Sequence, residues 1–342
     1  MARYHSPFLG WSIGHRLKSM NNTSAGMTLL GVLLLGVLAG LHAASWGGYK
    51  DSPFEGFHLR SFLRSLVVAV LASGLLALWQ GFGTGVIATL GAVYALERLA
   101  TEWWKTIVRN DDQSAYTIPM RLAVGGRPIQ STGVRYCVGG VVVLGLAAAG
   151  AALGTLESAL SHASPWVLAM TVGGAGGWAT AVGGAWKDAP IEGFSSFKFL
   201  RSPIVATAWA VPLSVLTSHP VLLLLASGGF AVASIETYKT FFTGGRPPGK
   251  FAGRPVLHRL PAIRQRLGRL HAALWAALGV GLLTSLPNDA PLADAAALLP
   301  NVLITAVAGC AGFLAILVLD RNAQLAGLEG PGRETLTLDG RR

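Results

Sequence analysis

The chain has 342 residues, of which 52% are hydrophobic and only 13% are charged, and its net charge is +11. Ordinary soluble domains have about 25% charged residues, so this composition excludes a typical soluble globular protein. Long apolar runs such as Met27–Ala44 and Val138–Leu153 recur along the chain. A helix of about 20 apolar residues crosses a bilayer. We therefore predict an all-α protein, a polytopic bundle of transmembrane helices in the cell membrane, with no nucleic-acid partner.

The hydrophobic pattern predicts nine transmembrane spans. In chain order they are expected at 26–45, 64–80, 82–100, 134–155, 164–185, 203–218, 219–238, 270–286 and 296–319. Two of them, 64–80 and 203–218, are short for a bilayer, so re-entrant or tilted segments are alternatives there. Residues 1–25 are predicted to form an N-terminal tail. Residues 321–342 are predicted to form a flexible C-terminal tail because they are polar and rich in glycine.

The basic residues predict the orientation in the membrane. Apart from those in the two tails, every Lys and Arg lies in, or at the edges of, the loops after the first, third, fifth and seventh spans. Because Lys and Arg are enriched in cytoplasmic loops, these odd-numbered loops and the C-terminus are predicted to be cytoplasmic. The basic N-terminal tail departs from this rule. Either it lies along the membrane interface or the predicted number of spans is wrong by one.

Three sequence blocks occur twice and in the same order. The first block, KDSPFEGFHLRSFLRS at 50–65, returns as KDAPIEGFSSFKFLRS at 187–202; we call these the first and second copies. The other blocks are EWWKT at 102–106 with ETYKT at 236–240, and GRP at 126–128 with GRP at 253–255. An even number of spans separates the copies, so both face the same side. We predict a parallel internal duplication of a four-helix unit, with halves at 26–160 and 161–320.

The duplicated blocks and their loops supply the candidate site residues. Proline and glycine in Lys-Asp-x-Pro-x-Glu-Gly-Phe predict a shaped loop rather than a continued helix. In Glu102-x-x-Lys105 and Glu236-x-x-Lys239, the i,i+3 spacing places both charges on one helix face. The acidic candidates for catalysis are Asp51, Glu55, Glu102, Asp188, Glu192 and Glu236. The candidates for anion binding are Lys50, Arg64, Lys105, Arg127, Lys187, Arg201, Lys239 and Arg254.

Each of these groups also has a purely structural interpretation. The charged copies would then be interfacial loops held by local ion pairs, and the Glu–Lys pairs would be exposed helix-end pairs worth at most about 0.5 kcal/mol. The basic run from Arg259 to Arg269 contains no acidic residue and fits a surface for anionic lipid headgroups. Cys137 and Cys310 lie in apolar segments and are interpreted as buried hydrophobic residues, not as disulfide partners or metal ligands.

The layout resembles the UbiA superfamily of intramembrane prenyltransferases, which has nine transmembrane helices in a duplicated bundle and two acidic motifs at cytoplasmic helix ends. The blocks at Glu102 and Glu236 would take the positions of those motifs. Arg127–Ser131 is similar to the segment after the first motif, and Lys198–Ala210 to the basic loop before the second. The resemblance implies a prenyl diphosphate substrate and a lipophilic acceptor. The Asp-rich motifs that hold Mg²⁺ in that family are absent here. Glu102, Asp111 and Asp112 could replace the first motif in part, but the sequence around Glu236 has no second carboxylate. The cofactor is therefore unknown, with Mg²⁺ as one candidate.

Two functions are consistent with this pattern. The first is an intramembrane transferase that acts on a phosphorylated isoprenoid or other lipid, at a polar site on the cytoplasmic face between the two halves. The second is a transporter or a non-catalytic membrane protein that binds anions or lipids. A transferase should bring carboxylates of both halves into a closed cavity that lipid can enter. A transporter should show a polar path that continues to the far face.

Overall fold

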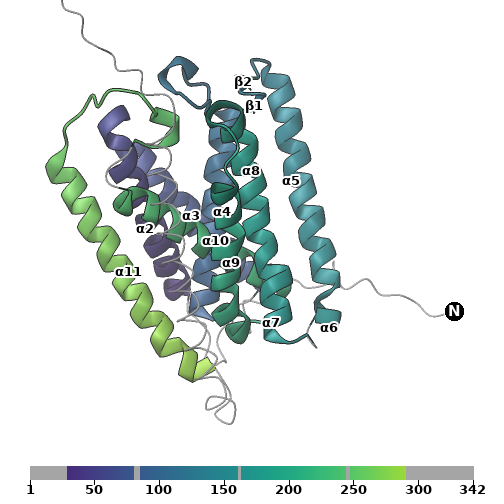
Figure 1. Cartoon of the computed structure of the whole chain (residues 1–342). Helices are drawn as coiled ribbons and strands as arrows, with labels where there is room; N and C mark the ends of the chain where they lie inside the picture. The colour runs from purple at the N-terminus through teal and green to yellow at the C-terminus, as the bar shows by residue number, and fades with distance from the viewer. Residues whose placement is uncertain (1–28, 81–84, 161–162, 244–246, 290–342) are drawn as a thin grey trace, which may run out of the picture.

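The computed structural model describes residues 29–80, 85–160, 163–243 and 247–289. Its long helices lie side by side in one bundle (Figure 1). The α-helices are α2 (Leu29–Glu55), α3 (Leu59–Gln80), α4 (Val86–Trp103), α5 (Thr132–Thr155), α6 (Glu157–Leu160), α7 (Pro165–Leu168), α8 (Gly174–Glu192), α9 (Ser196–Leu216), α10 (Pro220–Thr237) and α11 (Pro261–Asp289).

Short elements extend or connect these helices. One π-helical turn precedes α8 and two others continue α4 and α10, and the loop before α5 contains a two-stranded antiparallel hairpin. The π-helical turns are η1 (Trp104–Val108), η3 (Ala169–Gly173) and η4 (Tyr238–Phe242). The remaining elements are the 3-10 turns η2 (Gln113–Ala115) and η5 (Gly249–Phe251) and the strands β1 (Ala123–Val124) and β2 (Arg127–Pro128). The loops after η1 and η4 lie at the same end of the bundle, at the top of Figure 1; we call it the charged end.

Within the described residues, four segments are long and apolar enough to cross a membrane: α2, α3, α5 and α10 with η4. Large apolar side chains cover much of the outer surface, including Leu71, Leu144 and Leu283, which are 62%, 71% and 71% exposed. Exposed apolar area on this scale is typical of a surface that faces lipid. The predicted all-α class is confirmed, because the described elements are helices apart from one hairpin of two short strands. Each predicted span from 26–45 to 270–286 contains a helix, whereas the ninth span and both tails lie outside the described residues.

The prediction of a loop in Lys-Asp-x-Pro-x-Glu-Gly-Phe was wrong. α2 continues to Glu55 and α8 continues to Glu192, so the charged copies are helical up to the residue before glycine. Pro53 and Pro190 lie in the last turns, where each removes its own N–H donation to the carbonyl four residues back but is followed by only two helical residues. The helices end where Gly56 and Gly193 both adopt a φ of +81°, a conformation that glycine adopts without strain.

Glycines bring α2 against α3 and α8 against α9 in the same way. A Cβ on Gly40 would lie 2.6 Å from the Cα of Leu66, which leaves room only for glycine. At positions 137 residues later, a Cβ on Gly177 would lie 2.4 Å from the Cα of Pro203. Such close backbone approach is a common means of helix association in lipid, where burial of apolar surface gives little driving force.

The centre of the bundle is the crossing of α4 and α10. A Cβ on Gly229 would lie only 1.9 Å from the carbonyl oxygen of Gly91, so the two backbones touch there. Around this crossing pack fully buried side chains such as Val93 and Phe230. Since η1 and η4 continue these two helices, the crossing fixes where the Glu102 and Glu236 blocks lie relative to each other.

α5 and α11 lie at the outside of the bundle (Figure 1). α11 packs against α2. On α5, Cys137 is exposed on the outer surface of the protein and has a free thiol, which corrects the prediction of a buried cysteine. The helix is apolar all round, so the sequence offered no sign of which side faces the bundle. Cys310 lies outside the described residues.

Candidate functional site

An ion pair joins the first copy to the second Glu-x-x-Lys block. Lys50, near the end of α2, donates to the carboxylate of Glu236 at the end of α10. Both side chains are mostly buried, at 19% and 13% exposed. Glu236 also pairs with Lys239 at 3.4 Å, as its i,i+3 spacing predicted. One carboxylate therefore holds two lysines that are almost 190 residues apart in sequence.

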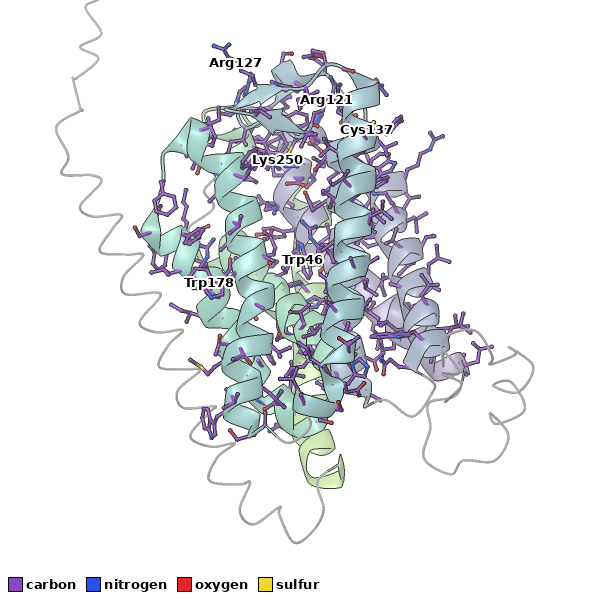
Figure 2. The ribbon with its side chains drawn as sticks, turned by 90° about the vertical axis from the view of Figure 1, so that its right-hand side faces the viewer. Trp46, Arg121, Arg127, Cys137, Trp178 and Lys250 are labelled. Atoms are coloured by element: carbon purple, nitrogen blue, oxygen red, sulfur yellow. The ribbon has the colours of Figure 1, made fainter. Side chains whose placement is uncertain are left out.

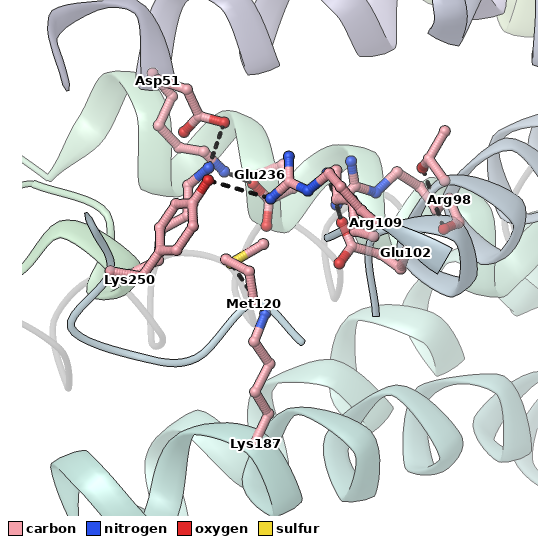
Figure 3. Close-up of polar contacts among 12 residues, drawn as sticks. Asp51, Arg98, Glu102, Arg109, Met120, Lys187, Glu236 and Lys250 are labelled. Atoms are coloured by element: carbon pink, nitrogen blue, oxygen red, sulfur yellow. Dashed lines mark hydrogen bonds and ion pairs between the residues drawn. The ribbon is translucent and has the colours of Figure 1, made fainter. Parts of the chain in front are cut away.

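A loop lysine links the two copies at the charged end. Lys250, in η5, pairs with Asp51 at 2.9 Å (Figure 3). It also pairs with Glu55 at 3.4 Å. Its neighbour Gly249 lies against the second copy, because a Cβ there would be 2.5 Å from Oε1 of Glu192. The sequence predicted a polar site between the two halves. Lys250 and Gly249 of this loop lie between the first and second copies and contact both of them.

The first Glu-x-x-Lys block is also an ion-pair cluster. Glu102 accepts from Lys105 at 2.9 Å, as predicted, and from Arg98 at 2.7 Å. Lys187 of the second copy lies close enough to act electrostatically on Glu102. The contact of its ammonium group is with the sulfur of Met120, at 3.5 Å, which is a weak acceptor. Figure 3 shows Lys187 reaching from its helix toward Met120 and the charged centre.

The four predicted anion-binding arginines have different surroundings. The guanidinium of Arg64 lies over the Trp104 ring, 4.7 Å from its centroid, and Arg201 acts electrostatically on Lys239. Arg254 donates to the backbone carbonyls of Ser114 at 2.6 Å and Tyr116 at 3.3 Å, so it ties the two long loops together. Arg127 points outward from the tip of the hairpin (Figure 2).

The remaining acidic candidates belong to the second copy. Glu192 pairs with Lys198 at 2.6 Å, with the lysine largely exposed. Asp188 lies beyond the predicted span 164–185 and is partly buried; this burial raises its pKa, although Lys187 and Lys239 lower it in part. Its counterpart Asp51 is held by Lys250. Equivalent carboxylates of the two copies are therefore in different environments.

Metal binding fits this site poorly. Every acidic candidate in the described residues except Asp188 has a Lys or Arg partner at ion-pair distance. In the same part of the chain, no group of three or more His, Cys, Asp or Glu side chains could hold a metal ion. The site therefore gives no residues with which to derive a Mg²⁺-dependent step, which Asp-rich motifs would have supplied.

Sequence reasoning missed three charged residues of this region. Arg98 could have been found, because it precedes Glu102 by one helical turn on the same face. Lys250 could not, because its partners are about 200 residues away. Glu97 is completely buried in α4, and both of its carboxylate oxygens lack a hydrogen-bond partner among the described residues. It lies near Arg64 and Arg98.

A buried polar cluster lies next to the charged end, inside the bundle. Nδ1 of His42 is 2.6 Å from the hydroxyl of Tyr94, and His271 lies 3.0 Å from both Ser45 and Thr237 through its two ring nitrogens. These contacts join α2, α4, α10 and α11. The histidines are not duplicated, so the sequence gave no reason to select them. Hydrogen bonds of this kind stabilise helix association within lipid.

Comparisons of the chain with protein-family models, with curated proteins and with solved structures gave no match. The likeness to intramembrane prenyltransferases therefore remains a resemblance of sequence layout.

Proposed function

We propose that this chain is a membrane-embedded protein that binds a phosphate-bearing lipid at its charged end, between two halves that arose by duplication. The duplication is supported by equivalent local structure at equivalent positions: helix ends at Gly56 and Gly193, and π-helical turns after both α4 and α10. The glycine contacts of α2 with α3 and of α8 with α9 are likewise 137 residues apart. The charged end is proposed to face the cytoplasm, as the basic loops predict.

The observation that carries the proposal is the environment of Lys187. Among the described residues, the five other lysines at the charged end have carboxylate partners: Lys50, Lys105, Lys198, Lys239 and Lys250. Lys187 instead meets a thioether and lies near the Arg98–Glu102–Lys105 cluster. A partly buried ammonium group without a carboxylate at contact distance gains most from an added anion. A phosphate group on a membrane lipid would supply that anion at the depth where the charged end lies.

Catalytic transfer is the finer form of this proposal, and Asp188 supports it. Burial raises the pKa of this carboxyl, and a carboxylate with a raised pKa is a better general base at neutral pH. In a prenyl transfer, Asp188 would take the proton of the acceptor while the carbon–oxygen bond to diphosphate breaks and the acceptor bonds to that carbon. The non-catalytic alternative, lipid or anion binding or transport, is supported by the full pairing of the other acidic candidates.

The binding proposal is tested by native mass spectrometry of the purified chain in detergent. Polyprenyl phosphate and the matching polyprenol are offered at equal concentration. We expect retention of the phosphate at least about fivefold above the alcohol, since a charge-assisted contact contributes about 1.5–3 kcal/mol. Lys187→Met should remove most of this preference, whereas Lys198→Met, at an exposed pair in the same copy, should leave it unchanged. Equal retention of phosphate and alcohol by the unaltered protein contradicts the proposal.

The transferase form is tested separately, by the release of diphosphate from polyprenyl diphosphate in the presence of membrane lipids. Asp188→Asn should lower the rate of release by about 100-fold, the smaller end of general-base effects. Binding without any release by the unaltered protein would favour the non-catalytic alternative.

A further inference from the structure

A pocket of about 330 Å³ opens beside the charged end, between the last turns of α2, the π-helical turn η4 and the beginning of α11. It contains Lys50 and Lys239, the two lysines that share Glu236. Three further basic residues line it, and its lining in the described part of the chain includes no acidic side chain. These three are His258, Arg259 and Arg264.

The buried hydroxyl of Thr240 indicates that the pocket is a binding site for a ligand and not only a charged surface. This residue lines the pocket and is only 7% exposed. Its hydroxyl is buried, and in the described part of the chain it has no hydrogen-bond partner. A buried hydroxyl without a partner costs free energy, so a ligand oxygen that accepts from it would be favoured.

The first turn of α11 has two further features that favour the binding of an anion in the pocket. The helix begins at Pro261 with no acidic residue in its first turn, so its positive end is not neutralised by its own sequence. The guanidinium of Arg264 lies over the Tyr49 ring, 4.4 Å from its centroid, which holds the planar group beside the pocket. Its Nε is buried and lacks a hydrogen-bond partner among the described residues. Both features suit the oxygens of a phosphate.

The pocket is also partly apolar, because Tyr49, Phe54 and Leu260 line it. Its volume is near the lower limit for small-molecule sites, about 300 Å³, which suits a headgroup better than a nucleotide. We infer that this pocket binds a phosphate ester, with the phosphate held by Lys50, Thr240, Arg264 and the first turn of α11. The inference goes beyond the proposed function, because Lys187 is not among the residues that line this pocket and the pocket is therefore a second phosphate site.

This assignment changes the interpretation of the basic run from Arg259 to Arg269. From the sequence, these residues formed one surface for lipid headgroups, in which charge alone mattered. In the structure, Arg259 and Arg264 line the pocket, whereas Arg266 is exposed elsewhere on α11. Arg266 therefore serves as a control for the substitution of Arg264, because it has the same charge on the same helix but lies outside the pocket.

The test uses the purified full chain in detergent and measures binding of dioleoyl phosphatidic acid by native mass spectrometry. Arg264→Met should weaken binding about tenfold, and Thr240→Val about three- to fivefold. Arg266→Met, which removes the same charge from the same helix, should bind as the unaltered protein does. Thr240→Ser retains the hydroxyl and should restore binding, which separates loss of the hydrogen bond from loss of folding.

Competition by glycerol 3-phosphate distinguishes the two sources of the phosphate. If millimolar glycerol 3-phosphate displaces the lipid, the pocket recognises the phosphate ester alone. If it does not, the apolar lining is also needed and the ligand is a lipid. The inference is overturned if Arg264→Met and Thr240→Val bind like the unaltered protein, or if Arg266→Met loses as much as Arg264→Met. In those cases the preference for polyprenyl phosphate over polyprenol can still hold, so the two proposals fail separately.

Discussion

The pairing of Lys50 with Glu236 gives a direct measure of how strongly α2 and α10 are coupled. Replacing Lys50 by Met removes the charge and leaves Glu236 with only Lys239, at 3.4 Å. Breaking a fully buried ion pair costs about 3–5 kcal/mol. Because Glu236 retains one partner and both side chains keep some exposure, we expect a loss of about 2–3 kcal/mol for Lys50→Met.

A double-mutant cycle isolates the pair. Lys50→Met, Glu236→Gln and the double variant are unfolded by titrating dodecyl sulfate into detergent micelles, with the fluorescence of the ten tryptophans as the signal. The coupling energy should be about 1–2 kcal/mol, within the range for residues in one ion-pair network. The pair of Lys198 with Glu192 is the control, because its lysine is 56% exposed. There the coupling should be below about 0.5 kcal/mol.

The reasoning is refuted if the two coupling energies are equal within error. Equality would mean that the contact between α2 and α10 is held by packing alone and that the first copy does not depend on the second Glu-x-x-Lys block. A coupling energy well above about 3 kcal/mol would be equally informative, because it would show that Lys239 does not compensate.

Three further predictions concern packing, protonation and orientation. Gly229→Ala should destabilise the protein by at least about 2–3 kcal/mol in the same titration, because its Cβ would lie 1.9 Å from the carbonyl oxygen of Gly91. Gly228→Ala is the control: the nearest atom to its Cβ would be 3.8 Å away, so the loss of stability should be under about 1 kcal/mol. Similar losses would contradict the close crossing. Because burial raises the pKa of Asp188, its contribution to stability is present below its unfolded pKa and lost as pH rises through the folded value. Asp188→Asn should therefore be more stable than the unaltered protein at pH 8 and equally stable near pH 3.5, and a difference independent of pH would contradict this. In a background that lacks Cys137 and Cys310, single cysteines at three positions of the charged end should react with a membrane-impermeant maleimide only after the membrane is opened. Labelling of intact cells at any of them would contradict the predicted orientation. These positions are Ser61, Ser114 and Ser195.

Local features of the fold followed from the sequence. Apolar runs predicted helices over every span within the described residues, because a backbone in lipid must satisfy its hydrogen bonds internally. The i,i+3 spacing predicted both Glu–Lys pairs, since residues three apart share a helix face. The ends of α2 and α8 were misjudged, because a helix can include a proline at the cost of one backbone hydrogen bond, and both helices end instead before Gly56 and Gly193.

The partners across the bundle were decided only by the tertiary structure. Nothing in the sequence near Lys50 indicates that its carboxylate is Glu236, or that Asp51 is held by Lys250. Both pairings depend on how α2, α10 and the loop before α11 pack, and that packing follows from the close crossing of α4 and α10 at Gly91 and Gly229. Periodicity specifies which residues share a helix face, but the neighbour of that face is set by the fit of whole helices. For the same reason the sequence assigned Arg264 to a charged surface, and only the packing of α11 on α2 placed it beside a pocket.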